Sequence, residues 1–504
     1  MNFFSRIISL TLLTLAVAST AQTVRTLRWA AIGGSVANAG YPARVGVRLP
    51  ADSVISYAFS GGTVLKSGDS SYWTSGKLAQ VFAYQPDIVS IQLGGNDSKS
   101  VNWGDSANFE RDYKALIDTL SSMPSQPRIL VVYPTPVWKN EAGTQSPNLL
   151  RGSVIGNSIL PLVRKVAKDK GTDTVDLYTP FVGRQALFTD SINPATATSD
   201  SLGRRVFEGF VAQSIRVMCV GNSITFGSGT AGVSIKDAYP IRLNMLLGKR
   251  FWVWNGGRIG DWMQRKTFPN AGTYKSYITE KAQMDTLFIR KPHYITIKLG
   301  TNDSRINWWK TADYISSYQY FIDTLYNNMN PKPKFVLIKP LPAWKVNNTW
   351  PFPPTGESGT NGINGDIIRD SVVPALQVVA TSRSSAVVGV SDMYTPFLSA
   401  LGTLVATSDG VHPGRIGHDT IAHVLYRTLV TAGVTTGIRS QTVKVRAHSN
   451  AVRFVKTKPE FSRPSGVHLN SLDGKSVSQN ESMASGVYVT TPKDKPKTNN
   501  QGGK

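Results

Sequence analysis

The feature that most constrains this chain of 504 residues is an internal repeat, in which several short motifs recur in the same order. A repeat unit of roughly 200 residues is the size of a whole domain, whereas the repeats of solenoids are several times shorter. The repeat therefore indicates two related domains in tandem. The matched blocks are residues 32–35 with 220–223, 60–62 with 255–257, 86–98 with 292–304, 134–139 with 340–345, 176–181 with 392–397, and 190–194 with 409–413.

Residues 1–21 have the pattern of a signal peptide. Arg6 precedes a largely apolar run over residues 7–18, and small residues lie before Gln22. No later run approaches the roughly 20 consecutive apolar residues that a membrane-spanning helix needs. We therefore expect a bacterial protein that is secreted or held at the cell surface, with no integral membrane segment and with its repeated domains at residues 22–214 and 215–436.

The formal net charge of +23 raises the question of an acidic partner. A nucleic acid is disfavoured, because a signal peptide directs the chain out of the cytoplasm and the basic residues are spread along the sequence. An acidic glycan or cell-surface polymer is the better candidate. The single cysteine, Cys219, excludes an intramolecular disulfide, and its apolar neighbours indicate an unreactive buried thiol. No residues have metal-ligand spacing, so we expect no metal and no cofactor.

Both copies alternate apolar, β-rich runs with longer amphipathic segments. Runs that are apolar on both faces and separated by helices are typical of a parallel sheet between two helix layers. The chain is therefore predicted to be α/β, with two tandem three-layer α/β/α domains whose sites lie at the carboxyl ends of the strands. The runs include residues 88–93, 129–133, 294–299 and 335–338, and the amphipathic segments include 109–120 and 312–325.

Two polar side chains of the second copy directly follow apolar strands. Ser223 comes after the run 216–220, on a strand-to-helix turn where its hydroxyl would be exposed and near free amides. Asn302 follows the run 294–299, and its side-chain amide can donate to developing negative charge. Each has a plain structural alternative: a serine after a strand is often only a helix cap, and Asn-Asp often only forms a turn.

A carboxylate and an imidazole lie close together in the block Asp409-Gly410-Val411-His412-Pro413. A carboxylate that accepts from Nδ1 fixes the histidine tautomer and leaves Nε2 free to take a proton from a serine. The alternative is an ordinary surface histidine. Taken with Ser223, the block indicates nucleophilic catalysis.

These blocks together resemble the signature of the SGNH (GDSL-like) hydrolases. The first block has Asn222 where many members have Asp, which leaves the nucleophile unchanged. The resemblance implies that Ser223 is the nucleophile, His412 its base and Asp409 the orienting carboxylate. It also implies an oxyanion hole made by the amides of Ser223 and Gly260 and the side chain of Asn302. The blocks that carry the resemblance are Gly221-Asn222-Ser223-Ile224-Thr225, Asn255-Gly256-Gly257-Arg258-Ile259-Gly260, Gly300-Thr301-Asn302-Asp303-Ser304 and Asp409-Gly410-Val411-His412-Pro413.

The resemblance implies a serine esterase, and similarity to bacterial carbohydrate acetylesterases favours an O-acylated, in particular acetylated, polysaccharide or sugar ester as substrate. Two alternatives stay open: a lipase or lysophospholipase, although no long apolar insertion suggests an acyl groove, and a carbohydrate-binding surface protein without turnover. Four tryptophans are candidates for stacking on sugar rings or for ordinary core positions, namely Trp262, Trp308, Trp309 and Trp344.

The first copy is predicted to be a degenerate, non-catalytic domain that binds glycan or packs against the second. Asn193 stands at the position of the histidine and has no nitrogen that can act as a base near neutral pH. No histidine occurs before His293 to replace it. In the block alignment Leu65 stands at the position of Gly260, whereas the retained positions are Ser35, Asn96 and Asp190.

Residues 437–504 differ in composition from the rest of the chain. Lys and Arg outnumber Asp and Glu by 12 to 4 over residues 439–504, and short strand-like runs alternate with turns. This segment resembles the C-terminal sorting modules of type-nine-secreted bacterial proteins. We expect a small β-rich module followed by a disordered tail from residue 492.

Overall fold

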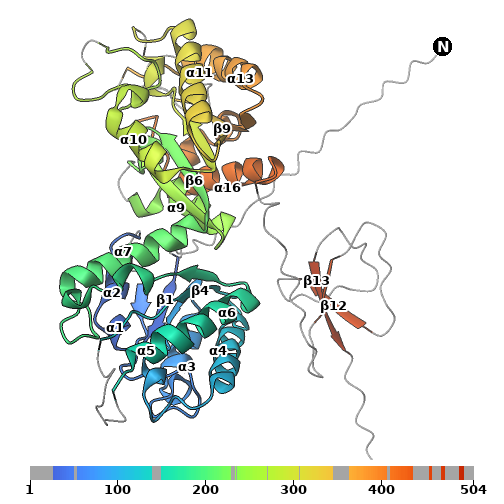
Figure 1. The fold of residues 1–504 in the computed structure, drawn as a ribbon. Coiled ribbons are helices and arrows are strands. Elements are labelled where there is room, and N and C mark those ends of the chain that lie inside the picture. Colours follow the sequence, from blue (N-terminus) through green and yellow to red (C-terminus); the bar gives the residue numbers. More distant parts are fainter. Residues whose placement is uncertain are drawn as a thin grey trace, which may run out of the picture. The chain divides into compact units, whose positions relative to one another are not determined.

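The computed structural model describes residues 27–434 except 50–53, 139–148, 229–232, 234, 269–270, 306, 344–361 and 406–408, together with three strands between 453 and 492. The predicted signal peptide, Trp344 and the predicted disordered tail after Pro492 lie outside the described residues, whereas Pro492 itself ends a strand. The structure contains two five-stranded parallel sheets, one in each copy of the repeat (Figure 1).

The two sheets have the same strand order. The first runs β2-β1-β3-β4-β5 and the second, read from the same edge, β7-β6-β8-β9-β10, with every pair of neighbours parallel. This agreement confirms the tandem α/β fold. The strands are β1 (Trp29–Gly33), β2 (Val54–Ser56), β3 (Ile88–Gln92), β4 (Arg128–Val132), β5 (Asp173–Val175), β6 (Ile215–Gly221), β7 (Phe251–Gly257), β8 (Tyr294–Lys298), β9 (Lys334–Lys339) and β10 (Val387–Asp392).

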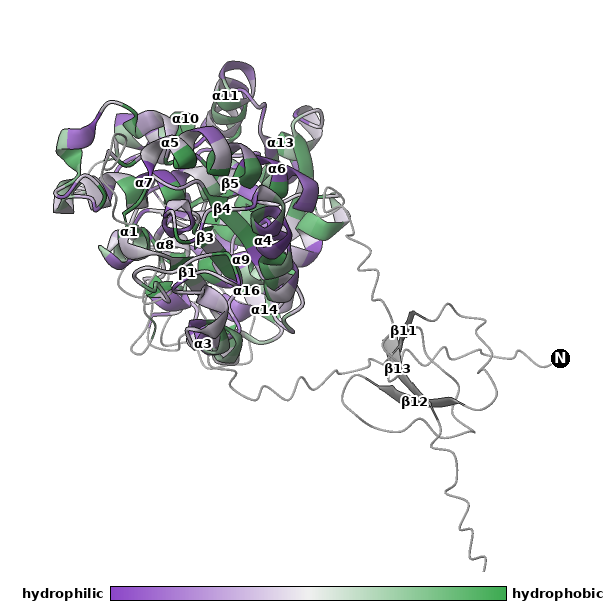
Figure 2. Ribbon diagram, turned by 60° about the horizontal axis from the view of Figure 1, so that its bottom comes forward, coloured by the Kyte–Doolittle hydropathy of each residue, from purple (hydrophilic) through white to green (hydrophobic). Residues whose placement is uncertain are grey.

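Helices cover both faces of each sheet, as the apolar runs predict. Along β3, Val89 and Ile91 belong to one core and Ile88 to the other, because successive strand residues point to opposite faces. Helices α4 and α6 supply the first of these cores, and α2 and α7 supply the second. Figure 2 shows hydrophilic and hydrophobic residues along the same helices, as expected of helices with one face against a sheet.

The helices of the first domain are α1 (Ser35–Asn38), α2 (Tyr41–Gly46), α3 (Lys77–Tyr84), α4 (Ser106–Ser121), α5 (Gly152–Val154), α6 (Leu160–Lys170) and α7 (Thr196–Ala212). Those of the second are α8 (Ser223–Phe226), α9 (Tyr239–Leu247), α10 (Lys281–Arg290), α11 (Thr311–Asn328), α12 (Gly365–Ile367), α13 (Val373–Ser382), α14 (Tyr394–Leu398), α15 (Leu401–Leu404) and α16 (Arg415–Thr431). No described helix is both long enough and apolar enough to cross a membrane.

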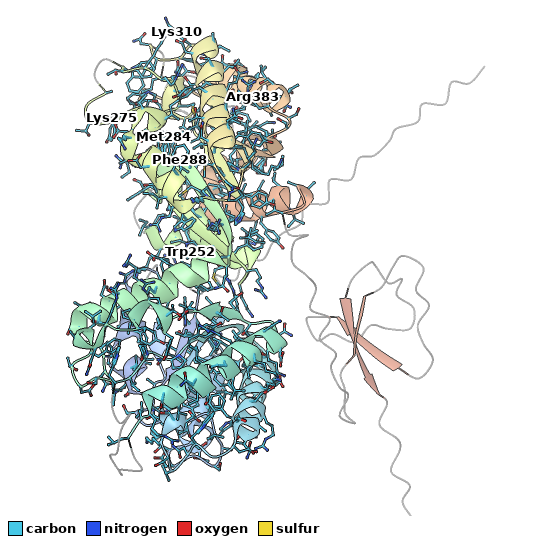
Figure 3. All side chains as sticks on the ribbon, in the orientation of Figure 1. Trp252, Lys275, Met284, Phe288, Lys310 and Arg383 are labelled. Carbon is cyan, nitrogen blue, oxygen red and sulfur yellow. The ribbon has the colours of Figure 1, made fainter. Side chains whose placement is uncertain are left out.

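The two α/β domains meet through an aromatic cluster and a buried arginine. Trp252 of β7 packs edge-on against Phe207 and Phe210 of α7, with ring centroids 5.3 and 6.0 Å apart (Figure 3). Arg128 of β4 donates to the Ser214 hydroxyl at 2.8 Å and to the Lys249 carbonyl at 3.0 Å, both beyond the end of α7. The last helix of the first domain is therefore shared with the second.

The C-terminal segment forms a separate compact unit, residues 439–504. Its described strands make an antiparallel sheet in the order β11-β13-β12. They are β11 (Arg453–Lys456), β12 (Val467–Ser471) and β13 (Val487–Pro492).

Candidate active site

Ser223 lies where a buried strand turns into a short helix. The five residues of β6 before it, from Val217 to Gly221, are buried, and α8 begins at Ser223 itself. Asn222 caps this helix, because its side-chain oxygen accepts from the Ile224 amide at 3.2 Å. The cap fixes the turn, and Ser223 is left 8% exposed at the carboxyl end of the strand.

His412 connects Ser223 to Asp409 across a sequence separation of 189 residues. Its Nε2 lies 2.8 Å from the Ser223 Oγ, and its Nδ1 lies 2.7 Å from the Asp409 Oδ2. The other carboxylate oxygen, Oδ1, accepts from the amides of Val411 and His412 at 2.9 and 3.0 Å. These backbone bonds hold the carboxylate in line with the ring, so the three side chains form a continuous hydrogen-bonded chain.

The ionised form of Asp409 favours the Nδ1–H tautomer of His412 that a base requires. Burial opposes ionisation of the carboxyl, but hydrogen bonds from the His412 ring and from two backbone amides outweigh it, and its pKa lies below the ordinary value. An ionised carboxylate accepts a hydrogen bond from Nδ1–H, which leaves the lone pair of Nε2 directed at the Ser223 hydroxyl. The arrangement can therefore deprotonate Ser223.

Gly260 and Asn302 lie on the loops that follow β7 and β8, the two strands on either side of β6. Gly260 has φ +79°, and a β-carbon there would lie 2.2 Å from the Tyr274 ring, so only glycine fits. Asn302 donates through Nδ2 to the Asp261 carbonyl at 2.8 Å, which leaves its second N–H available. Among the described residues the amides of Ser223 and Gly260 donate to no acceptor. These free donors are the kind that an oxyanion requires.

The family model for GDSL-like lipases and acylhydrolases matches residues 19–196 and again residues 219–420. The chain belongs to the GDSL-like lipase/acylhydrolase family. Both α/β domains therefore belong to this family, as the resemblance predicts.

Several proteins are similar to parts of the chain. An acetylxylan esterase of Xylanibacter ruminicola is 29% identical over 232 residues, which cover 42% of this chain and 42% of that protein. This chain thus spans less than half the length of that relative. The solved structure of a carbohydrate acetylesterase from Sinorhizobium meliloti is 15% identical, with a TM-score of 0.33, and covers 43% of this chain and 98% of that one. An aryl esterase of M. smegmatis is 15% identical, with a TM-score of 0.34, and covers 44% and 100%.

Asp303 organises the loop that carries Gly260, a role that the sequence did not suggest. Its buried carboxylate accepts from the Met263 amide at 3.0 Å and from the Gln264 amide at 2.9 Å. Burial raises the pKa of Asp303 to about 6, although the backbone bonds favour the ionised form. In the first domain the Asp97 carboxylate likewise accepts hydrogen bonds from the amides of Val64 and Leu65. The signal in the sequence is the repeated Asn-Asp-Ser, which places an aspartate next to the asparagine in both domains.

Two buried basic side chains near the site were also missed. Lys298 ends β8 beside Gly221 in the sheet; its Nζ is buried without a hydrogen bond, and burial lowers the pKa of Lys298 to about 7. His418 of α16 is buried with neither ring nitrogen bonded, and burial lowers its pKa to about 3. A lysine at the end of an apolar run was the only signal in the sequence. The described residues hold no group of His, Cys, Asp and Glu arranged to bind a metal ion.

Two of the predicted sugar-stacking tryptophans lie in a core. Trp262 and Trp308 are 1% and 7% exposed and pack with Phe268, whose ring stacks on Trp308 at a centroid distance of 4.5 Å. Burial on this scale leaves no ring face for a sugar, which favours the core interpretation. Trp309 is half-buried against Tyr314. An exposed aromatic ring instead lies against Gly260, that of Tyr274, which is 41% exposed.

The first domain repeats the aspartate turn with an amide in place of the imidazole. Asn193 donates through Nδ2 to the Asp190 Oδ2 at 2.8 Å, as His412 contacts Asp409. The Asp190 Oδ1 accepts from the amides of Ile192 and Asn193. The Asp-to-backbone geometry is thus retained although the base is absent.

The expectation that Leu65 replaces Gly260 is wrong. Phe59 donates to the Gly33 carbonyl as Arg258 donates to the Gly221 carbonyl, so Phe59 matches Arg258 and Gly61 matches Gly260. Gly61 also has a positive φ, +86°. In agreement, Asn96 bonds to the Gly62 carbonyl as Asn302 bonds to the Asp261 carbonyl. The sequence alignment failed because it matched two Gly-Gly pairs, and the Gly-Gly of the second domain lies inside β7.

Proposed function

We propose that this protein is a secreted serine esterase that removes acetyl groups from an O-acetylated polysaccharide, with its catalytic centre in the second domain. The observation that carries the proposal is the hydrogen-bonded chain Ser223–His412–Asp409, with contacts of 2.8 and 2.7 Å. Secretion rests on the signal-peptide pattern of residues 1–21. The acetylated polysaccharide is supported by the similarity to an acetylxylan esterase.

In the first half of the proposed reaction the Ser223 Oγ attacks the ester carbonyl carbon while His412 Nε2 takes the hydroxyl proton. The carbonyl oxygen becomes an oxyanion, to which the amides of Ser223 and Gly260 and the Asn302 side chain donate. When the intermediate collapses, the bond to the sugar oxygen breaks and His412 returns its proton to that oxygen. An acetyl-serine and a free sugar hydroxyl result.

In the second half water replaces the sugar. His412 takes a proton from water as the water oxygen attacks the acetyl carbon, and the same donors hold the oxyanion. Collapse breaks the bond to Oγ and returns the proton to Ser223, so acetic acid leaves and the enzyme is regenerated. Asp409 stays ionised throughout and stabilises the imidazolium that forms in each half.

Tyr274 supports a sugar as the alcohol portion of the ester. Its ring is 41% exposed and lies against Gly260, one of the proposed oxyanion donors. An aromatic ring presents an apolar face beside a polar tip, which suits the mixed surface of a sugar. We therefore assign to Tyr274 the stacking role that the buried tryptophans cannot take.

The testing experiment measures acetate release from acetylated xylan and hydrolysis of 4-nitrophenyl acetate and 4-nitrophenyl palmitate. The mature protein should act on both acetates, and Ser223→Ala but not Ser35→Ala should abolish this activity. Tyr274→Ala should raise KM for acetylated xylan several-fold while changing 4-nitrophenyl acetate little. Palmitate as the preferred ester would instead indicate a lipase, and no turnover of any ester would contradict the proposal.

A further inference from the structure

The first domain contains a cavity at the position that corresponds to the catalytic centre of the second. The cavity is open to solvent, and the empty space within it and at its mouth is about 340 Å³. Its walls come from the ends of β1, β3 and β4 and the turns after them. The lining residues are Gly34, Ser35, Val36, Gly62, Gln92, Leu93, Gly95, Asn96, Pro134, Thr135, Val137, Leu150 and Ile192.

All three donors of the proposed oxyanion hole have counterparts beside this cavity. Ser35 follows β1 as Ser223 follows β6, and Gly61 has the backbone conformation of Gly260. Within the described residues the amides of Ser35 and Gly61 donate to no acceptor. Asn96 uses one N–H to hold the Gly62 carbonyl at 3.3 Å, which leaves the other N–H available. A carbonyl oxygen in the cavity would therefore find the same type of donors as in the second domain.

The one missing group is the base. Asn193 keeps the hydrogen bond to Asp190, but its remaining polar atom, Oδ1, is a buried acceptor without a partner. A carboxamide has no basic nitrogen and cannot take the Ser35 proton near neutral pH. A bound ester would thus be held but not attacked.

The lining chemistry selects a neutral ligand with a small apolar group. Among the described residues that line the cavity none is ionisable, and Gln92 stands where the second domain has Lys298. Apolar walls are supplied by Val36, Leu93, Val137 and others. The described lining thus offers an anion no cation, whereas an acetyl ester matches both the free amides and the apolar walls.

We propose that the first domain is a non-hydrolysing binding site for O-acetyl groups on a sugar chain. The acetyl carbonyl accepts from the Ser35 and Gly61 amides and from Asn96, and the acetyl methyl group lies among the apolar walls. The choice of a sugar as the ligand's alcohol rests on the proposed function, whereas the choice of an acetyl ester is based on the groups that line the cavity. Binding at such a site would hold the second domain close to polysaccharide that still carries acetyl groups.

The test uses the full chain with Ser223→Ala, so that no ester is consumed. Isothermal titration with O-acetylated xylotetraose should show two binding events in this protein, one for each domain. Adding Leu150→Trp, whose larger side chain fills the cavity from its wall, should remove one of them. Val47→Trp, on a first-domain surface residue that is 72% exposed, is the matched control and should leave both events intact. Deacetylated xylotetraose should bind the first domain at least tenfold more weakly.

The two proposals fail in different ways. If Leu150→Trp removes no binding event although its melting temperature matches that of Val47→Trp, the first-domain site is refuted whatever the second domain does. Equal affinity for acetylated and deacetylated xylotetraose would refute the acetyl specificity. If unmodified protein releases no acetate but the event sensitive to Leu150→Trp is present, only the proposed function fails.

Discussion

The two α/β domains have the same sheet and the same aspartate turn, and they differ in the residue that this turn presents to the serine. In the second domain the turn presents His412, and in the first it presents Asn193. The correction from Leu65 to Gly61 makes the contrast sharper, because the first domain retains a glycine with positive φ where the second has Gly260. The imidazole of His412 is thus the group of the proposed catalytic chain that the first domain lacks, while its serine, glycine, asparagine and aspartate positions are retained.

The largest expected effect comes from making the second domain resemble the first. His412→Asn should lower kcat for 4-nitrophenyl acetate by about 10³-fold or more, because Ser223 loses its base while the oxyanion donors stay. Initial rates measure the effect. His423→Asn, on the same domain but without a contact to Ser223, should retain full activity. More than a tenth of the normal rate in His412→Asn would contradict the assigned base.

A smaller loss should follow from removing an oxyanion donor. Asn302→Ala should reduce kcat by about 10² to 10³, the usual cost of one such donor. Asn96→Ala removes the corresponding bond to a loop carbonyl in the first domain and is a matched control for stability. Comparable rate losses in both variants would show that Asn302 acts on folding rather than on the reaction.

The reverse exchange should create activity in the first domain. In a Ser223→Ala background, Asn193→His places an imidazole beside Asp190, which already has the required backbone bonds. We expect release of 4-nitrophenol about tenfold above that of Ser223→Ala alone, since the other groups are present. Adding Ser35→Ala should remove the gain. A gain that survives Ser35→Ala would come from elsewhere and would contradict the equivalence of the two sites.

The smallest effect concerns stability and the Lys298–Gln92 difference. Burial lowers the pKa of Lys298 from 10.5 to about 7. Between these pH values the unfolded chain binds a proton that the folded chain does not. The stability lost by burying the charged Lys298 is therefore full below pH 7 and disappears toward pH 10.5. Lys298→Gln should therefore raise the free energy of unfolding at pH 6 by on the order of a few kcal/mol, which corresponds to a melting temperature several degrees higher. At pH 10 the melting temperature should change little. Calorimetry measures this.

The control for that measurement is Lys310→Gln, on an exposed lysine of the same domain. Its melting temperature should follow the unmodified protein at every pH. A stabilisation by Lys298→Gln that is equal at pH 6 and pH 10 would mean that packing rather than charge burial explains it.

Local patterns carried the fold and much of the candidate site. Apolar runs on both strand faces predicted the layers, and the block that holds Asp409 and His412 predicted a contact between the carboxylate and Nδ1, which the structure contains. What failed depended on three-dimensional register. β2 has three residues and β7 has seven, so equal letters did not mean equal positions, and Gly61 was missed.

Other residues were missed because burial and neighbours are set by the fold. Lys298, His418 and Tyr274 have no motif, and only the packed structure shows that the first two are enclosed and that the third lies against Gly260. The same holds for Trp262 and Trp308, since the sequence alone does not distinguish a tryptophan that stacks on a sugar from one in the core, and only their burial decides it.

The arginine at the junction has a consequence for the cooperativity of the molecule. Arg128 reaches from the first sheet to Ser214 and Lys249, and its guanidinium lies 4.3 Å from the ring centroid of Phe210, which also contacts Trp252. Opening the second domain would take the Lys249 carbonyl from Arg128, although the ion pair with Asp173 would remain. It would also separate the Trp252 ring from Phe207 and Phe210, and both losses are costly. The two domains should then melt in a single heat-absorption peak, and the domain without a base would survive selection as half of one folding unit.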